Sequence, residues 1–384
     1  MTENLKTSSY DFSAIPYPDL VRVGQRSMLY KDLFTVSWLL GRFCNYKCSY
    51  CWPYARSDKK DFRPTELCLL TVDEIKRQAR ERNFNSFHFS LSGGEPTFHP
   101  GYLDILKHLA DDTPNTNYTS IHMTSNCSRN MEWFKTYVDY AKVFHRASIT
   151  ASLHTEHVNS PEKMQEFADK LILCQEHNVQ VTINMVMVPG WFEKSYENAL
   201  FFHNQGINVT LKPQSDPTAS KVVSGYTPEM LSILHNGMPQ RGFTEVKNKY
   251  VTRPEPRYFK TPDPIYREGS TVPQHFQVEF IDKQNKVWYM DQAERFNAFN
   301  FNKFNGWECS SGYRSIIIRE PDGSIKRSYS CHDAPLGNIE TGFKLFDGPV
   351  VCTSPSCVSS ADSKIPKRVA GTKLPLWPGD KTYE

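Results

Sequence analysis

Short apolar runs alternate with longer amphipathic stretches along the middle of this 384-residue chain. The apolar runs predict six strands, at 33–40, 86–91, 119–124, 147–153, 179–187 and 207–213. The stretches between them have apolar positions at helical spacing. Strands that alternate with helices in this way are typical of a parallel sheet with right-handed crossovers. The pattern therefore predicts an α/β fold, and it leaves open whether the sheet closes.

Several predicted helices have recognisable ends. The segment Thr71–Glu74 has the form of a capping box, which predicts a helix that begins there and ends near Arg82. Ser160-Pro161 places a capping serine and a first-turn proline at the start of another helix. A third helix is predicted over 192–205, with Gly206 as its C-terminal stop.

The alternation ends after residue 236, and the rest of the chain has a different composition. A proline-rich stretch with scattered lysines and arginines predicts a bridging segment. Two hairpins are then predicted, the first at 276–282 and 286–290 and the second at 315–319 and 324–329. We therefore predict an N-terminal extension (1–32), an α/β domain (33–236), the bridging segment (237–275), a β-rich domain (276–366) and a loosely ordered tail (367–384).

Composition and charge exclude some classes of function. The net charge of +3 is too small to predict a nucleic-acid partner. No apolar run approaches the ~20 residues that span a bilayer, and the N-terminus lacks the apolar core of a signal peptide. The ten cysteines are therefore predicted to be thiolate ligands in a reducing cytoplasm, with no disulfides and no membrane partner.

Three cysteines, Cys44, Cys48 and Cys51, fall within eight residues directly after the first predicted strand. A loop this short can turn three thiolates onto one inorganic group. An iron–sulfur cube normally takes four cysteines, so three ligands leave one iron open to a substrate or cofactor. The alternative is a zinc site, which would need a fourth ligand. The nearest candidates, Cys68 and His88, stand at no familiar zinc spacing.

The segment Gly93-Gly94-Glu95 follows the second predicted strand. Together with the C-x3-C-x2-C spacing, it resembles the signature of the radical S-adenosylmethionine (radical SAM) superfamily. The resemblance implies an incomplete (β/α)6 barrel and a [4Fe–4S] cluster on Cys44, Cys48 and Cys51, with S-adenosylmethionine on the fourth iron. It also implies reductive cleavage of that cofactor to a 5'-deoxyadenosyl radical, which abstracts hydrogen from a substrate carbon. An external donor of the flavodoxin or ferredoxin type would supply the electron.

The resemblance also assigns cofactor contacts at the strand ends, where ligands gather in such folds. Gly93 and Gly94 would let the backbone approach the methionine moiety, and Glu95 would pair with its ammonium group. Tyr50 would contact the adenine, and Ser152, at a strand end, would form a hydrogen bond with the ribose. Asn126 and Asn184 are weaker candidates, because each could equally be a strand-end polar group whose hydrogen bonds are made within the protein.

Other polar or thiol side chains near the strands have less certain roles. His154 and His157 follow the fourth predicted strand, where a histidine can bind substrate, relay a proton or cap the loop. Cys68, Cys127 and Cys174 have no partners at useful spacing and are predicted to be ordinary buried thiols.

A second cysteine set lies near the C-terminus and consists of Cys309, Cys331, Cys352 and Cys357. The first two flank the Asp322-Gly323 hairpin and resemble the opening of a SPASM or twitch domain, an extension of radical SAM enzymes that carries auxiliary clusters. Four cysteines are too few for a complete SPASM domain and enough for one fully ligated cube. The resemblance is therefore closer to a twitch domain. A structural zinc site on the same four thiolates is the alternative.

These features predict a radical SAM oxidoreductase with one auxiliary [4Fe–4S] cluster. Family members with such extensions commonly modify peptides, and we expect oxidation or crosslinking of a peptide side chain. Radical oxidation or rearrangement of a small molecule, such as an aminosugar or a nucleotide, is the alternative. The 32 residues before the first predicted strand are few for a leader-binding domain, which weakens the peptide interpretation. A non-enzymatic iron–sulfur protein is the distant rival, and it would not need Gly93-Gly94-Glu95-Pro96.

Overall fold

The six predicted strands form one parallel sheet. A computed structural model describes residues 11–25, 32–217, 221–246, 249–258, 278–290, 296 and 299–376. Neighbouring strands pair in chain order, each parallel to the next. They are β2 (Leu33–Leu39), β3 (Ser86–Ser92), β4 (Tyr118–Ser125), β5 (Arg146–Leu153), β6 (Val179–Met187) and β7 (Asn208–Pro213). The strand predictions are confirmed, with boundaries that differ by at most one residue.

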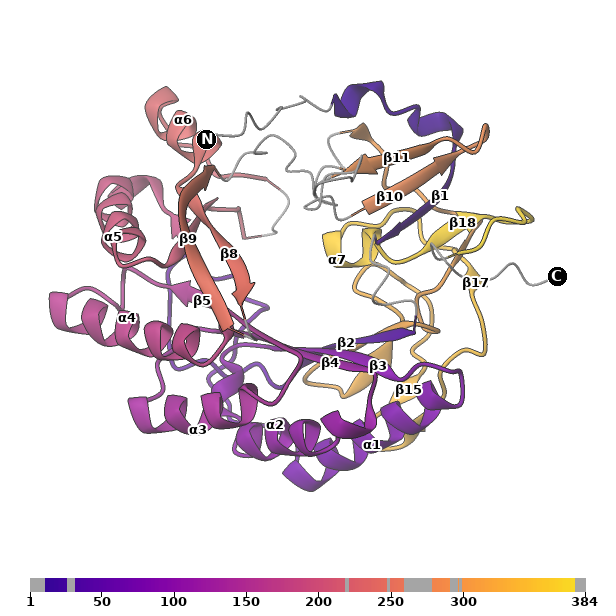
Figure 1. Cartoon of the computed structure of the whole chain (residues 1–384), viewed down its shortest axis with the longest axis horizontal. Helices are drawn as coiled ribbons and strands as arrows, with labels where there is room; N and C mark the ends of the chain where they lie inside the picture. The colour runs from indigo at the N-terminus through magenta and orange to yellow at the C-terminus, as the bar shows by residue number, and fades with distance from the viewer. Residues whose placement is uncertain are drawn as a thin grey trace.

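Helices between these strands form the outer layer of the α/β part, along the lower and left sides of Figure 1. They are α1 (Thr65–Arg80), α2 (Tyr102–Asp111), α3 (Met131–Ala141), α4 (Pro161–Glu176) and α5 (Phe192–Asn204). Two further helices follow, α6 (Pro228–Asn236) and the short α7 (Ser360–Ser363). Among the described residues, no helix combines the length and apolar character needed to cross a bilayer.

The two faces of the parallel sheet differ in polarity. Along β2, Phe34, Val36 and Trp38 are buried in the core that the strands share with the helices. Thr35 and Ser37, at the alternate positions, point to the opposite face because successive side chains of a strand alternate. The inner face of the sheet is therefore polar, although a parallel sheet is usually apolar on both faces.

Most predicted helix ends are confirmed, and one is wrong. The Ser160 side chain caps α4, and Gly206, with φ of 85°, follows α5. The predicted capping box at Thr71 lies inside α1, which begins at Thr65. The Thr71 hydroxyl donates to the Leu67 carbonyl oxygen at 2.7 Å, one turn earlier, so it satisfies a helix carbonyl and caps no helix end.

The C-terminal part extends the parallel sheet beyond β2. The second predicted hairpin is confirmed as β13 (Ser315–Ile318) and β14 (Ser324–Lys326), and β13 also pairs with β2 in parallel. The short strands β15 (Gly337–Asn338) and β16 (Gly342–Phe343) complete a ten-stranded sheet. The parallel pairing of β13 with β2 was not predicted.

A second sheet, of six strands, contains one strand from the N-terminal part of the chain and several from its C-terminal part. Its order is β11-β10-β1-β18-β12-β17. The predicted N-terminal extension supplies β1 and the predicted tail supplies β18, so neither end is merely a loose segment. The strands are β1 (Leu20–Gln25), β10 (Val278–Asp282), β11 (Val287–Met290), β12 (Trp307–Cys309), β17 (Val350–Val351) and β18 (Lys367–Val369).

The predicted bridging segment is only partly described. It contains an antiparallel pair, β8 (Pro239–Val246) and β9 (Lys249–Tyr258). Residues 247–248 and 259–275 of this segment, residues 276–277 of the predicted β-rich domain and residues 377–384 of the predicted tail lie outside the described residues.

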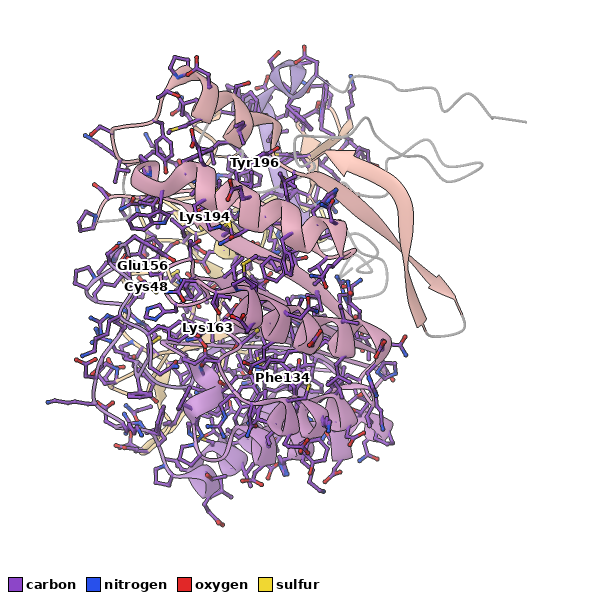
Figure 2. All side chains as sticks on the ribbon, turned by 90° about the vertical axis from the view of Figure 1, so that its left-hand side faces the viewer. Cys48, Phe134, Glu156, Lys163, Lys194 and Tyr196 are labelled. Atoms are coloured by element: carbon purple, nitrogen blue, oxygen red, sulfur yellow. The ribbon has the colours of Figure 1, made fainter. Side chains whose placement is uncertain are left out.

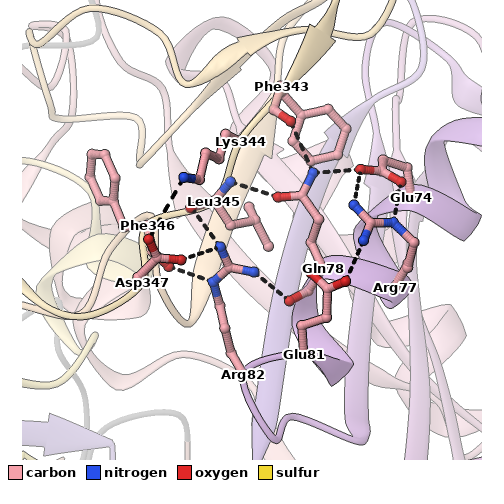
Figure 3. A network of polar contacts seen from close by, with 10 residues as sticks. All are labelled: Glu74, Arg77, Gln78, Glu81, Arg82, Phe343, Lys344, Leu345, Phe346 and Asp347. Carbon is pink, nitrogen blue, oxygen red and sulfur yellow. Dashed lines mark hydrogen bonds and ion pairs between the residues drawn. The ribbon is translucent and has the colours of Figure 1, made fainter.

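Helix α1 is bonded to a C-terminal segment, residues 343–347 (Figure 3). The Gln78 amide donates to the Phe343 carbonyl oxygen at 2.9 Å and accepts from the Leu345 N–H at 2.8 Å. Arg82 donates to the Phe346 carbonyl oxygen at 2.7 Å. These contacts hold the C-terminal part against the α/β part, so both cysteine sets belong to one packed body.

Candidate active site

The loop that follows β2 carries Cys44, Cys48 and Cys51. The Cys44 N–H donates to the Ser57 carbonyl oxygen at 3.2 Å, and the Cys51 N–H donates to that of Cys48 at 3.1 Å. Cys48 is buried and the other two are half-buried. The Cys48 thiol interacts electrostatically with both of the others. The three predicted ligands therefore share one short loop that backbone hydrogen bonds hold, and their joint binding of a cluster stays a prediction.

The protonation of these thiols depends on their burial. Burial raises the pKa of Cys44, Cys48 and Cys51, and that of Cys48 to about 12. Only a thiolate is a good metal ligand. A buried thiolate is stable where a bound cation offsets its lost hydration. Three thiols clustered in one short loop fit a [4Fe–4S] cluster that keeps one iron open.

The Gly93-Gly94 pair lies against the backbone that leads into this loop. The Gly94 N–H donates to the Gly41 carbonyl oxygen at 3.0 Å, and the Glu95 N–H donates to that of Phe43 at 2.7 Å. A Cβ atom on Gly93 would lie 2.3 Å from the Gly41 oxygen, and one on Gly94 would lie 2.4 Å from the Phe43 oxygen. Glycine is required here for backbone packing. The expected approach to a methionine moiety stays a prediction.

The buried Glu95 carboxylate accepts four hydrogen bonds. Its Oε1 accepts from the Thr97 N–H at 3.2 Å, the Thr97 hydroxyl at 2.6 Å and the Ser125 hydroxyl at 2.8 Å. Its Oε2 accepts from the Asn126 N–H at 2.6 Å. Burial raises the pKa of this carboxyl and the donors oppose that rise. Glu95 therefore joins its own loop to the end of β4, and its predicted pairing with an ammonium group would have to use Oε2.

Asn126 contacts the cysteine loop directly. Its Nδ2 donates to the Asn45 side-chain oxygen at 2.9 Å and lies 3.9 Å from the Cys44 sulfur. Its side-chain oxygen accepts from the Ser128 N–H at 3.0 Å. This residue is thus a polar neighbour of a predicted iron ligand. Hydrogen bonds to cluster sulfurs are one of the factors that set a cluster's reduction potential.

On the other side, the loop after β5 supports the cysteine loop. The Glu156 carboxylate accepts from the Ser49 N–H at 2.8 Å, and Figure 2 shows Glu156 beside Cys48. The Tyr50 hydroxyl and the His154 Nδ1 lie 2.7 Å apart. The β5 loop therefore fixes the position of both residues between the second and third cysteines.

His157 completes this contact. Its ring stacks on Tyr46, with centroids 4.0 Å apart. Burial lowers the pKa of His157, and it lowers that of His154 to about 4. Ligand atoms of Cys48, Glu156 and His157 all lie within 4.8 Å of one another. The two histidines, for which a cavity role and a loop role were both open, thus pack against the cysteine loop.

Comparison with known proteins identifies this region. Residues 38–203 match the model of the Radical SAM superfamily. The chain contains a radical SAM domain. It is therefore an enzyme that uses S-adenosylmethionine, and its cofactors include a [4Fe–4S] cluster. A search of curated proteins found no match.

Some solved structures also align with about four-fifths of the chain. One is described as "Native anSMEcpe with bound AdoMet", with 14% identity, a TM-score of 0.46, and coverage of 81% of this chain and 79% of that one. Another is "Native anSMEcpe with bound AdoMet and Cp18Cys peptide", with 13% identity, a TM-score of 0.47, and coverage of 81% and 78%. With TM-scores below 0.5, these likenesses support no conclusion about this chain.

Within the radical SAM domain, Ser152 and Asn184 are direct neighbours across β5 and β6. Both are half-buried on the polar inner face. Neither side chain makes a hydrogen bond within the described part of the chain. The structure therefore brings these two candidates together, while their contacts with a cofactor stay predictions.

The second cysteine set is also brought together. Cys309, Cys331, Cys352 and Cys357 all line one small cavity beyond the radical SAM domain. They reach it from β12, from the segment after β14 and from the segment after β17. Four thiols on one cavity fit either a fully ligated cube or a zinc ion.

Polar groups around this cavity are directed at the sulfurs. The Ser311 N–H donates to the Cys309 sulfur at 3.5 Å, and the Ser328 hydroxyl donates to the Cys331 sulfur at 3.2 Å. The Ser354 hydroxyl, which also lines the cavity, is buried without a partner among the described residues. Burial raises the pKa of Cys357 to about 11, and the Lys367 ammonium opposes that rise. Such donors stabilise thiolates that bind a metal.

The three remaining cysteines are buried, as predicted. The sulfur of Cys68 lies 3.7 Å from the His99 Nε2, and His88 bonds elsewhere. Cys127 has a φ of 53° and follows β4, and Cys174 lies in α4.

The polar inner face of the sheet was not predicted from the sequence. The Nδ1 atoms of His88 and His122 lie 2.8 Å from the hydroxyls of Ser120 and Ser148 on the neighbouring strands. Burial lowers the pKa of His88 to about 3 and that of His122 to about 4. The alternation of polar and apolar residues along the strands is the signal that would have found this face.

Proposed function

We propose that this radical SAM enzyme reductively cleaves S-adenosylmethionine to a 5'-deoxyadenosyl radical, which abstracts hydrogen from a substrate carbon. The observation that carries the proposal is the contact between the Gly93–Glu95 loop and residues 41–43, which lead into the Cys44–Cys51 loop, at the carboxyl ends of β2 and β3. In parallel α/β folds, ligands bind at this end of the strands.

The chain's own residues hold and orient the reacting groups. Cys44, Cys48 and Cys51 would ligate the cluster. Asn126, beside the Cys44 sulfur, and Glu156, on the Ser49 N–H, would keep the loop in one conformation. Tyr50, Ser152 and Asn184 are the proposed contacts of the cofactor's adenosine.

We further propose that the sheet is an incomplete (β/α)6 barrel followed by a twitch-like domain. Six parallel strands in chain order, covered by helices on one face, support the barrel. The β13–β14 hairpin between Cys309 and Cys331 supports the twitch-like assignment.

We infer that Cys309, Cys331, Cys352 and Cys357 hold one auxiliary [4Fe–4S] cluster. Support comes from the cavity that all four line and from the donors aimed at two of the sulfurs. Four thiolates saturate a cube, so this group would carry an electron or hold the domain together without coordinating substrate.

The proposed substrate is a peptide whose side chain is oxidised or crosslinked. A small-molecule substrate is the second candidate, favoured by a partly open cavity of about 230 Å³ beside the polar face. The proposed electron donor is a flavodoxin or ferredoxin, and no nucleic-acid or membrane partner is proposed. The ten thiols and oxygen-sensitive clusters favour a cytoplasmic location.

Metal analysis tests the cluster assignment. Wild-type protein, reconstituted without oxygen, should hold about eight irons per chain. Replacement of Cys44, Cys48 and Cys51 by alanine together should leave about four, and replacement of the C-terminal four should also leave about four. Zinc in place of iron in the first triple variant would show that the second set is a structural zinc site.

Product analysis tests the reaction. With a strong reductant, wild type should release 5'-deoxyadenosine slowly even without substrate, and Cys48→Ala should release none. With a substrate deuterated at the reacting carbon, label should enter one deoxyadenosine per turnover. Deuterium retained in the product, with S-adenosylmethionine regenerated, would indicate an isomerase.

A further inference from the structure

A partly open cavity of about 230 Å³ lies against the inner face of the sheet. Strands β2, β3 and β13 form one wall, with Thr35, His88 and Ser315 among the lining residues. The opposite wall comes from residues 327–329 and 361–366. The cavity is large enough for several water molecules or one small ligand. It therefore suits a small polar group rather than a folded peptide.

This cavity adjoins the second cysteine set. Ser328, Asp362 and Ile365 line both this cavity and the cavity of the four thiols. The Asp362 carboxylate accepts from the Ser330 N–H at 2.8 Å and from its hydroxyl at 2.7 Å. The Asp362 carboxylate on the cavity wall thus already accepts hydrogen bonds from within the protein.

Two residues that line the cavity each carry a buried polar atom with no partner among the described residues. These atoms are Nη2 of Arg327 and the hydroxyl oxygen of Ser315. Arg327 is 4% exposed and Ser315 is 8% exposed. A buried donor left unpaired costs about 1–3 kcal/mol, and more for a charged group, so native proteins usually satisfy such donors.

The rest of the Arg327 guanidinium is fixed. Its Nε donates to the Ser311 carbonyl oxygen at 3.2 Å, and its Nη1 pairs with Asp333. Its carbon lies 5.5 Å from the centroid of the Phe346 ring. Because these contacts fix the orientation of the guanidinium, its unpaired Nη2 is a hydrogen-bond donor with a fixed direction.

Positive charge predominates around this space. Arg314 and Lys364 also line the cavity. After burial, the charges of His122, Lys364 and Arg146 lower the pKa of His88, and those of Arg146 and Lys364 lower the pKa of His122. The complementary ligand is therefore an anion.

We propose that this cavity binds an oxyanion group of the substrate, a carboxylate or a phosphate, which accepts from Arg327 Nη2 and Ser315 Oγ. The inference rests on the proposed function, because it assumes a substrate that enters the space beside the polar face. A carboxylate would come from a peptide, and a phosphate from a nucleotide or sugar phosphate. Arg327 and Ser315 would then position the substrate without taking part in the chemical step.

Calorimetry with two anions tests this proposal independently of turnover. Inorganic phosphate and glutarate are titrated at low ionic strength into the anaerobically reconstituted, full-length enzyme. Wild type should bind one of them, Arg327→Met should bind it at least tenfold more weakly, and Ser315→Ala a few-fold more weakly. Lys344→Met, which removes an exposed cation nearby, is the matched control and should bind as wild type does.

Binding of glutarate alone would identify a carboxylate site, and binding of phosphate alone a phosphate site. No binding to wild type, or equal binding to all variants, would overturn the proposal. If Arg327→Met fails to fold, Arg327→Lys and Ser315→Ala decide in its place. Deoxyadenosine release by wild type tests the proposed function separately, so an enzyme that releases it but binds neither anion refutes the cavity proposal alone.

Discussion

Glu156, in the loop after β5, accepts a hydrogen bond from the backbone N–H of Ser49 at 2.8 Å. The two residues lie more than a hundred positions apart in the sequence, yet this contact falls directly after Cys48. The cysteine loop, which follows β2, is therefore held by the loop at the end of β5, with β3 and β4 between the two strands in the sheet. Loss of that contact should loosen the loop while leaving its thiols intact.

We predict that Glu156→Ala lowers the iron content of the first cluster. The substitution removes a charge-assisted hydrogen bond, worth about 1.5–3 kcal/mol, from a backbone donor in the loop. Iron should be counted after anaerobic reconstitution of a protein that lacks the four C-terminal cysteines. Glu193→Ala, an exposed glutamate in α5, is the control. Equal iron in the two variants would mean that Glu156 does not organise the loop.

The two glycines before Glu95 permit a second prediction. Gly94→Ala would place a Cβ atom 2.3 Å from the Arg42 carbonyl oxygen. Because that contact is with backbone, we expect a loss of at least 1–3 kcal/mol in the free energy of unfolding, together with less bound iron. Gly190→Ala, where nothing lies within 4 Å of the added atom, should change stability by less than about 0.5 kcal/mol. Similar denaturation curves for both variants would contradict the packing argument.

Protonation of the polar face gives a third prediction. The pKa of His88 is lowered to about 3, chiefly by burial, against ~6.5 for an unfolded histidine. Between these values the unfolded chain binds more protons, so the stability present above pH 6.5 is lost as the pH falls. In His88→Asn the slope of unfolding free energy against pH should be shallower by up to ~1.4 kcal/mol per unit.

Chemical denaturation of wild type and His88→Asn at several pH values between 7.5 and 5.5 measures this slope. Asparagine keeps a polar group that can reach the Ser120 hydroxyl, now 2.8 Å from the histidine Nδ1. The comparison therefore isolates the titration from the lost hydrogen bond. Parallel plots for the two proteins would show that His88 is not buried in its neutral form.

The buried ammonium of Lys367 gives a fourth prediction. It donates to the carbonyl oxygens of Asp362 at 2.6 Å and Ile365 at 2.9 Å, and its charge favours the thiolate of Cys357. We expect Lys367→Met to lower iron from about eight towards about four per chain. The exposed Lys373→Met is the control. If the Lys367→Met variant still holds about eight irons per chain, the ammonium of Lys367 is not needed for the auxiliary cluster.

The sequence predicted what depends on local pattern. Burial of alternate residues in strands such as Phe34-Thr35-Val36 defines the parallel sheet, and the short spacing from Cys44 to Cys51 places three thiols in one loop. The helix cap at Ser160 was also predictable, because the serine and the Lys163 N–H that it binds are only three residues apart in the sequence. Such signals lie within one element.

What the sequence did not predict depends on contacts between distant elements. Neither the pairing of β13 with β2 nor the contribution of β1 to the C-terminal sheet has a local signal. The roles of Arg327 and Ser315 depend on which buried atoms remain without partners, and only packed side chains reveal that. Thr71 was misassigned because a threonine inside a helix and one at its cap look alike in sequence.

The pairing of β13 with β2 has a consequence for synthesis of the protein. β2 is the first strand of the large sheet to leave the ribosome, and its outer neighbour is made long afterwards. Until then the nascent chain presents an open strand edge, which is the kind of surface that pairs with other chains. A truncated chain that ends at residue 236 would retain every strand of the radical SAM domain. It should nonetheless aggregate, because its β2 edge would remain uncovered.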